Sequence, residues 1–171
     1  MSTKVIAFDM LGTAIDPSGV DRDEIRAYLA CCTDRPWLRQ QLPESWKQLP
    51  AFEDTREGIR RLRTKFIVVP LSNLSSDVIK AVSEKAGVVW DDCKPLEYLR
   101  TYKPDPMAYL SVCEEFSVQP ADVLMVTANP TFGPFPFGDI EMAKMLGMQA
   151  QLIRNPGCPQ TITDLADQLG C

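Results

Sequence analysis

Short apolar runs alternate with helical patterns along the chain, and this alternation limits the fold more than any other feature. The apolar runs span 4–8, 66–71, 123–126 and 150–153, with a weaker run at 88–90, and the helical patterns span 55–65, 76–86, 106–116 and 139–146. Continuous apolar strands that alternate with helices are typical of a parallel sheet with both faces covered. The sequence therefore predicts an α/β fold, a Rossmann-like doubly wound parallel sheet.

Polar side chains follow three of the predicted strands, at the point where each strand ends. Asp9 follows the first strand, Ser72 and Asn73 follow the second, and 127–129 follows the third. In open α/β sheets, ligands bind in the crevice outside the carboxyl ends of the strands. We therefore expect these three clusters to meet in one pocket.

Two segments interrupt the alternation. We interpret 16–51, which holds helical stretches between prolines, as a small helical cap inserted into an α/β core formed by 1–15 and 52–171; an ordinary helical crossover is the alternative. The segment 130–138 contains three prolines, two glycines and three phenylalanines, so we expect a loop there. Its phenylalanines suit a pocket lid, a contact in a homodimer, or packing against the chain itself.

The composition excludes several classes of function. The 171 residues include no histidine, which rules out Ser-His-Asp and Cys-His hydrolases. A net charge of −5 leaves no basic surplus for a nucleic acid, and no apolar stretch approaches the ~18 residues of a membrane span. Six cysteines without a CxxC pair, together with an N-terminal segment lacking a signal-peptide pattern, predict a cytoplasmic protein.

Asp9 is the candidate nucleophile. A carboxylate at a strand end can attack a carbon or phosphorus centre and form an ester or acyl phosphate, which water later cleaves. The motifs around it are, in chain order, Phe8-Asp9-Met10-Leu11-Gly12-Thr13, Leu71-Ser72-Asn73, Tyr102-Lys103-Pro104-Asp105-Pro106 with Tyr109, and Gly138-Asp139 with Ala143 and Gly147. Together they resemble the haloacid dehalogenase superfamily and are most similar to its 2-haloacid dehalogenase branch.

The resemblance implies a role for each matching residue. It makes Asp9 the nucleophile, gives Thr13 and Ser72 hydrogen bonds to its carboxylate or to the substrate, and makes Lys103 the cation that balances the carboxylates. It implies that Asp139 orients the hydrolytic water or, in metal-dependent branches, binds Mg²⁺ together with Asp9. The other predicted site residues are the catalytic Asn73 and the substrate-binding Leu11, Arg39, Tyr109, Thr127 and Asn129, with Arg35 as a second candidate for the cap arginine that receives the halide and the substrate carboxylate.

Leu11 favours one branch of this superfamily over another. Superfamily phosphatases carry a second aspartate at this position, which protonates the leaving group and assists hydrolysis. Leucine does neither, and a halide leaves without a proton. We therefore expect a hydrolase that acts on a small anionic substrate, a short 2-haloalkanoic acid, without a cofactor. There are two alternatives: a Mg²⁺-dependent phosphatase for small phosphate esters, and a non-catalytic binding protein that keeps the fold. Ala128, where the dehalogenase branch usually has a serine, supports the non-catalytic alternative.

Overall fold

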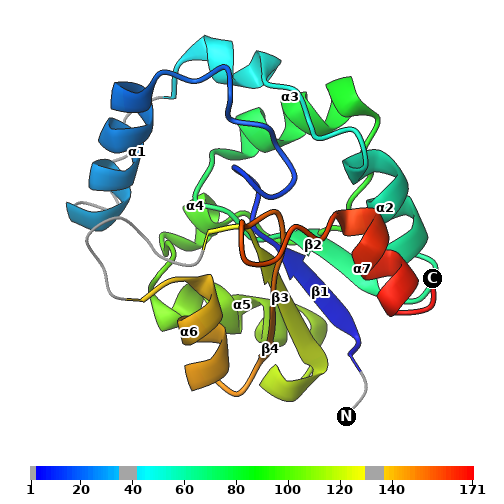
Figure 1. The fold of residues 1–171 in the computed structure, drawn as a ribbon. Coiled ribbons are helices and arrows are strands. Elements are labelled where there is room, and N and C mark those ends of the chain that lie inside the picture. The colour runs from blue at the N-terminus through cyan, green and yellow to red at the C-terminus, as the bar shows by residue number, and fades with distance from the viewer. Residues whose placement is uncertain (1–2, 35–41, 130–136) are drawn as a thin grey trace.

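A parallel sheet of four strands lies at the centre of the structure, a computed structural model that describes residues 3–34, 42–129 and 137–171, without the side chains of 29–34 (Figure 1). The strands are β1 (Val5–Phe8), β2 (Ile67–Pro70), β3 (Val123–Thr127) and β4 (Gln149–Leu152). Their order in the sheet is β2-β1-β3-β4, and every pairing is parallel. The predicted α/β fold with a doubly wound parallel sheet is confirmed.

Helices cover both faces of the sheet. They are α1 (Arg22–Asp34), α2 (Thr55–Leu62), α3 (Ser76–Ala86), α4 (Leu96–Leu99), α5 (Pro106–Phe116), α6 (Asp139–Met145) and α7 (Ile162–Gln168), with short 3-10 turns η1 (Glu44–Gln48) and η2 (Pro120–Asp122). Ile6 and Phe8 of β1 pack with α2, α3 and α7, whereas Val5 and Ala7 pack with α5 and α6. Because successive side chains of a strand point to opposite faces, a strand buried on both faces reads as one continuous apolar run.

Local sequence signals fix several of these elements. Helix α5 begins with Pro106, and the Asp105 carboxylate accepts a hydrogen bond from Met107 N (2.8 Å) at its first turn. Helix α3 ends at Gly87, which has a φ of 65°. Gly58 lets α7 pack close to α2, since a Cβ at this position would lie 2.5 Å from Ile162 Cγ2.

The weak strand predicted at 88–90 is wrong. The segment has no regular structure, and the contact with β2 falls one residue later, at Asp91. Asp91 N donates to Val68 O (2.9 Å), while the Asp91 carboxylate accepts from Val68 N (2.8 Å). A side chain thus takes the place of the backbone partner that a fifth strand would supply.

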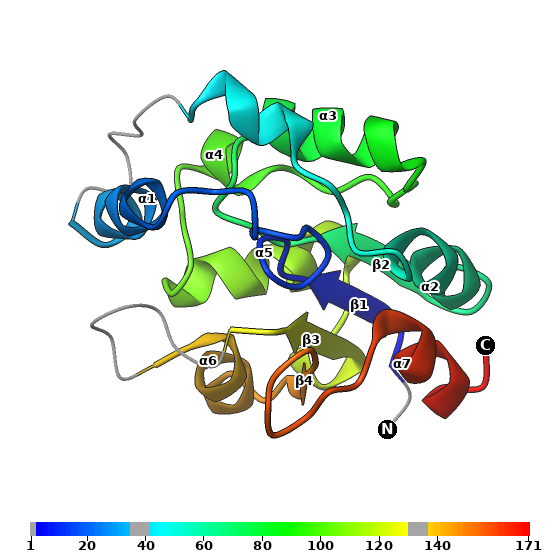
Figure 2. The same cartoon turned by 45° about the horizontal axis from the view of Figure 1, so that its top comes forward.

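The predicted cap segment contains α1 and η1, and α1 lies beyond the carboxyl end of β1 in both views (Figure 1, Figure 2). The division into a core and a cap stays a prediction. Most of the 130–138 loop lies outside the described residues, as do Arg35 and Arg39, so the expected lid, dimer contact and cap arginine are not tested. None of the described helices is long and apolar enough to cross a membrane.

Candidate active site

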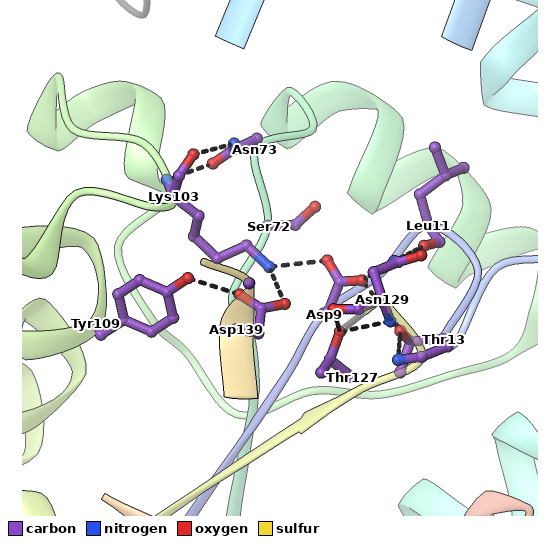
Figure 3. A network of polar contacts seen from close by, with 12 residues as sticks. Asp9, Leu11, Thr13, Ser72, Asn73, Lys103, Tyr109, Thr127, Asn129 and Asp139 are labelled. Atoms are coloured by element: carbon purple, nitrogen blue, oxygen red, sulfur yellow. Dashed lines mark hydrogen bonds and ion pairs between the residues drawn. The ribbon is translucent and has the colours of Figure 1, made fainter. Parts of the chain in front are cut away.

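The Asp9 carboxylate, at the carboxyl end of β1, accepts hydrogen bonds on both of its oxygens (Figure 3). Lys103 Nζ lies 2.8 Å from Oδ1, whereas Thr13 Oγ1 and Asn129 Nδ2 lie 3.0 and 2.7 Å from Oδ2. These donors come from the loops that follow β1 and β3 and from the segment before α5. The carboxylate is therefore held in one orientation while it remains slightly exposed, at 6%.

Lys103 joins Asp9 to a second carboxylate. Its Nζ lies 3.0 Å from Asp139 Oδ2, and the hydroxyl of Tyr109 donates to Asp139 Oδ1 (2.7 Å). The Asn73 side chain accepts from Lys103 N and donates to Lys103 O, each at 2.8 Å, so that the backbone of this lysine is also fixed. Lys103 and Asp139 are 1% and 0% exposed, which places the whole ion pair inside the core.

Burial and charge act against each other on these groups. Burial disfavours the ammonium of Lys103, but the adjacent Asp139 and Asp9 carboxylates outweigh it and raise the pKa of this lysine. Burial raises the pKa of Asp139, the negative charge of Asp9 adds to the effect, and Lys103 opposes it. Burial, followed by the Asp139 charge, also raises the pKa of Tyr109, so its hydroxyl stays a proton donor.

A tight turn after Asp9 carries one of its hydrogen-bond donors, Thr13. Gly12 adopts a φ of 85°, a conformation that side-chain-bearing residues rarely adopt. The turn places the Thr13 hydroxyl between two partners, because it donates to Asp9 and accepts from Ala128 N (2.9 Å). The Asn129 amide donates to Leu11 O (2.8 Å) as well as to Asp9, which ties the loop after β3 to this turn.

A cavity of about 180 Å³ opens beside Asp9. Its described lining consists of Asp9, Leu11, Gly12, Pro17, Ile25, Tyr28, Ser72, Asn73, Lys103 and Asn129. Sequence reasoning missed Pro17, Ile25 and Tyr28. The last two stand three residues apart on α1, a spacing that brings them to one face of a helix. That spacing was the available signal.

The structure brings together most of the predicted site residues. Asp9, Thr13, Lys103, Asn129 and Asp139 form one connected network. Their catalytic roles stay predictions.

Other predicted residues lie next to this network or behind it. Ser72 lines the cavity, and its hydroxyl accepts from Leu74 N (3.1 Å). Thr127 accepts from Asn129 N (3.0 Å) with its hydroxyl and so orients that residue. Tyr109, Thr127 and Asp139 are fully buried and are absent from the described cavity lining.

The charges favour an ammonium over a metal ion between the two carboxylates. Lys103 Nζ already lies within 3.0 Å of both Asp9 and Asp139. In the part of the chain that the structure describes, no group of three or more His, Cys, Asp or Glu side chains gathers to hold a metal.

The chain resembles known dehalogenases in sequence. No protein-family model matches it. It is 33% identical over 99 residues to (S)-2-haloacid dehalogenase 4A of Burkholderia cepacia, a match that covers 56% of this chain and 43% of that protein. The chain thus spans about half the length of the curated relatives it matches, because the matches cover 43–50% of those proteins.

Solved structures show the same fold. The L-2-haloacid dehalogenase PA0810 matches with a TM-score of 0.77 and 22% identity, over 98% of this chain and 99% of that one. The L-2-haloacid dehalogenase of Xanthobacter autotrophicus with chloropropionic acid covalently bound matches with a TM-score of 0.67 and 22% identity, over 98% of this chain and 82% of that one.

The chain therefore has the haloacid dehalogenase fold. The resemblance to 2-haloacid dehalogenases, predicted from four short motifs, is confirmed by these neighbours in sequence and structure.

Proposed function

We propose that this chain is a haloacid dehalogenase-like hydrolase that removes the halide from a short 2-haloalkanoic acid through an ester on Asp9. One observation carries the proposal: a buried carboxylate, fixed by Lys103, Thr13 and Asn129, borders a small cavity with largely apolar walls. An aspartate held in this way is arranged to act as a nucleophile toward a bound carbon centre. The dehalogenase resemblance supports the same chemistry.

The reaction proceeds in two steps. An oxygen of Asp9 attacks C2 of the haloacid, a C–O bond forms, the carbon–halogen bond breaks, and its electron pair leaves with the halide. Water then attacks the carbonyl carbon of the ester, the acyl C–O bond breaks, and the 2-hydroxy acid leaves as a proton is released. Lys103, Thr13 and Asn129 stabilise the negative charge that develops on the Asp9 oxygens in the second step.

Asp139 is the proposed acceptor of the released proton. Its raised pKa makes it a stronger base than an ordinary aspartate. The resemblance assigns the hydrolytic water to Asp139 and Asn129, and of these two residues Asn129 lines the cavity. An Asp139→Asn variant is expected to release about one halide per active site and then stop, because the ester forms but is not hydrolysed. Rapid-quench halide assays, with mass spectrometry of the trapped protein, measure this.

The cavity limits the substrate to a small molecule. Its volume of about 180 Å³ lies below the range of about 300–1,000 Å³ that is typical of pockets for drug-sized ligands. Leu11, Ile25 and Tyr28 give it apolar walls suited to the alkyl part of a haloacid. Asp9, Asp139 and Lys103 together carry one net negative charge, so an anionic substrate needs a further cation, which we assign to Arg39 or Arg35.

The proposed chemistry uses no metal or other cofactor, because Lys103 supplies the positive charge and a halide needs no proton to leave.

The cysteines support the proposed cytoplasmic location. Those whose side chains are described are free thiols, namely Cys93, Cys113, Cys158 and Cys171.

Halide release from each enantiomer of 2-chloropropanoate, without added metal, tests the function. We expect release from one enantiomer, and its loss by at least about 10⁴-fold in Asp9→Asn. Activity that appears only on a phosphate ester with Mg²⁺ would replace the proposal with the phosphatase alternative. No turnover of either substrate class would leave the non-catalytic alternative.

A further inference from the structure

Arg154 contacts the turn that follows Asp9 without lining the cavity. It lies two residues after β4, with a φ of 51° that is uncommon for a residue other than glycine. Its Nε donates to Thr13 O at 2.8 Å. Thr13 is the residue whose hydroxyl donates to Asp9 Oδ2 at 3.0 Å. One residue therefore connects the guanidinium to the proposed nucleophile.

The guanidinium of Arg154 is itself fixed on two sides. Its terminal nitrogen forms an ion pair with Asp54, and its plane lies over the ring of Phe52, with Cζ 4.0 Å from the ring centroid. Asp54 also accepts from Ile162 N (2.7 Å), so it is anchored to the start of α7. With 13% and 18% of their side chains exposed, Arg154 and Asp54 form a mostly buried pair.

The next residue of the turn is held separately. Ala14 O accepts from Phe52 N (3.2 Å) and from the hydroxyl of Thr55 (3.0 Å). The neighbouring carbonyl, Thr13 O, has Arg154 as its donor. Without the arginine, Thr13 O would lose this donor, while Thr13 N and Ala14 N would keep their hydrogen bonds to Met10 O (3.1 and 2.9 Å). The expected consequence is a local shift of Thr13 and of its hydroxyl, with Ala14 still in place.

We propose that Arg154 is a positioning residue that acts through Thr13 to hold the Asp9 carboxylate in its reactive orientation; this inference rests on the proposed dehalogenase function. Arg154 is absent from the described lining of the cavity beside Asp9. Substrate binding should therefore depend little on it, whereas the rate of ester formation should depend on it strongly. A small misplacement of a reacting group costs up to about 100-fold in rate.

A surface hollow gives direct access to this arginine. It has a volume of about 510 Å³ and is lined by Gly12, Pro17, Phe52, Arg154, Asn155, Pro156 and Pro159. A small guanidinium compound can therefore enter the space that Arg154→Ala would leave. This makes chemical rescue a specific test, because a compound that restores the missing hydrogen bond does not repair a general loss of stability.

Steady-state kinetics with 2-chloropropanoate provide the first measurement. For Arg154→Ala we expect kcat to fall about 10- to 100-fold with little change in KM. Millimolar methylguanidinium should restore part of this loss, whereas methylammonium at the same concentration should not. Asp54→Asn keeps the arginine but removes its ion pair, and we expect a smaller fall in kcat.

Arg63→Ala is the matched control. Arg63 forms a partly buried ion pair with Asp91 (2.6 Å), on the β2 side of the sheet. We expect its kcat to stay within about twofold of wild type, without an effect of methylguanidinium. If Arg63→Ala loses as much activity as Arg154→Ala, or if methylguanidinium restores nothing, Arg154 has only a structural role and the inference is wrong.

Amide hydrogen exchange tests the positioning without any activity. Ala128 N donates to the Thr13 hydroxyl, so its protection reports on where that hydroxyl lies. We expect faster exchange at Ala128 in Arg154→Ala and unchanged exchange at Leu71 N, which donates to Phe8 O (2.7 Å). A wild-type protein that releases no halide would refute the proposed function, and unchanged exchange at Ala128 would refute the role of Arg154.

Discussion

The base of the cavity and its wall on α1, which we call the cap-side wall after the predicted cap, are held in different ways. At the base, Asp9 and Lys103 are buried, and ion pairs of 2.8 and 3.0 Å join Lys103 to Asp9 and to the fully buried Asp139. On the cap side, Ile25 and Tyr28 stand on α1, whose other described side chains are exposed. Trp46 connects this helix to the core: its indole N–H donates to Glu24 (3.0 Å), and its ring packs edge-on against Tyr28 (5.4 Å between centroids).

This difference separates the chemistry from the choice of substrate. The core fixes the carboxylate of Asp9, the proposed nucleophile, so substitutions there should stop the proposed reaction and also destabilise the fold. The lightly attached helix forms the wall that a substrate's alkyl group would touch, so changes there should alter selectivity while the fold persists. Substitutions in the two regions should therefore have different signatures, and the largest effects belong to the base.

Lys103→Met should have the largest effect, because it leaves two buried carboxylates facing each other without their cation. We expect no measurable halide release and a loss of about 3–5 kcal/mol in the free energy of unfolding. Urea denaturation followed by circular dichroism measures the second quantity. If Lys103→Met is as stable as the wild type, the ion pairs of Lys103 contribute little to the free energy of unfolding.

The same ion pair gives an alkaline signature. Because the pKa of Lys103 is raised in the folded protein, the stability from its charge is fully present below the unfolded value of 10.5 and is lost as the pH rises through the folded pKa. The difference in unfolding free energy between wild type and Lys103→Met should stay constant from pH 7 to about 10 and shrink above that. If this difference in unfolding free energy is already small at pH 8, the pKa of Lys103 is not raised in the folded protein.

Tyr28→Ala should change selectivity at the cap-side wall. Removing the ring enlarges the cavity, and one methylene in an apolar pocket is worth about 10-fold or more in kcat/KM. We therefore expect the ratio of kcat/KM for 2-chlorobutanoate over 2-chloropropanoate to rise by about 10-fold. Tyr98→Ala, at a tyrosine 71% exposed on α4, is the control and should keep the wild-type ratio. An unchanged ratio in Tyr28→Ala would remove α1 from substrate selection.

Glu24→Ala should produce the smallest effect. It removes the acceptor of the Trp46 indole N–H and costs about 1 kcal/mol of stability. We expect KM to rise a few-fold with kcat preserved, because α1 shifts while Asp9 does not. Asp23→Ala, at the neighbouring exposed acid on α1, should leave KM unchanged. A fall in kcat in Glu24→Ala would show that the two regions are coupled.

The sequence was most informative at the base of the site. Asp9 and Lys103 lie 94 residues apart in the chain and Lys103 and Asp139 lie 36 apart, yet the resemblance carried by the ordered motifs predicted that they act together. The meeting of Asp9 with Asn129 was predicted from their places after two strands, because parallel strands bring such positions to one edge of the sheet. The individual hydrogen bonds, such as those between Asn73 and the backbone of Lys103, depend on loop geometry that no residue pattern encodes.

The residues of the cap-side wall and the contact of Arg154 with Thr13 were not predicted, for different reasons. Helix α1 contacts the buried Trp46 through Glu24 and Tyr28, and the apolar spacing on the helix did not show which surface it meets. Arg154 belongs to no motif, and its role follows from a contact with a backbone carbonyl. Helix α7 has a readable signal, the capping box between Thr161 and Asp164, although sequence reasoning missed it.

A single turnover in ¹⁸O-labelled water, with protein in excess over 2-chloropropanoate, tests the nucleophilic role of Asp9 most directly. If Asp9 forms the ester and water attacks its carbonyl carbon, the first lactate carries an unlabelled oxygen and the label enters the peptide that contains Asp9. Mass spectrometry of lactate and of that peptide reads both positions. We expect label in the peptide and none in the first lactate. Labelled lactate with an unlabelled peptide would mean that water attacks the substrate directly and that Asp9 is not the nucleophile.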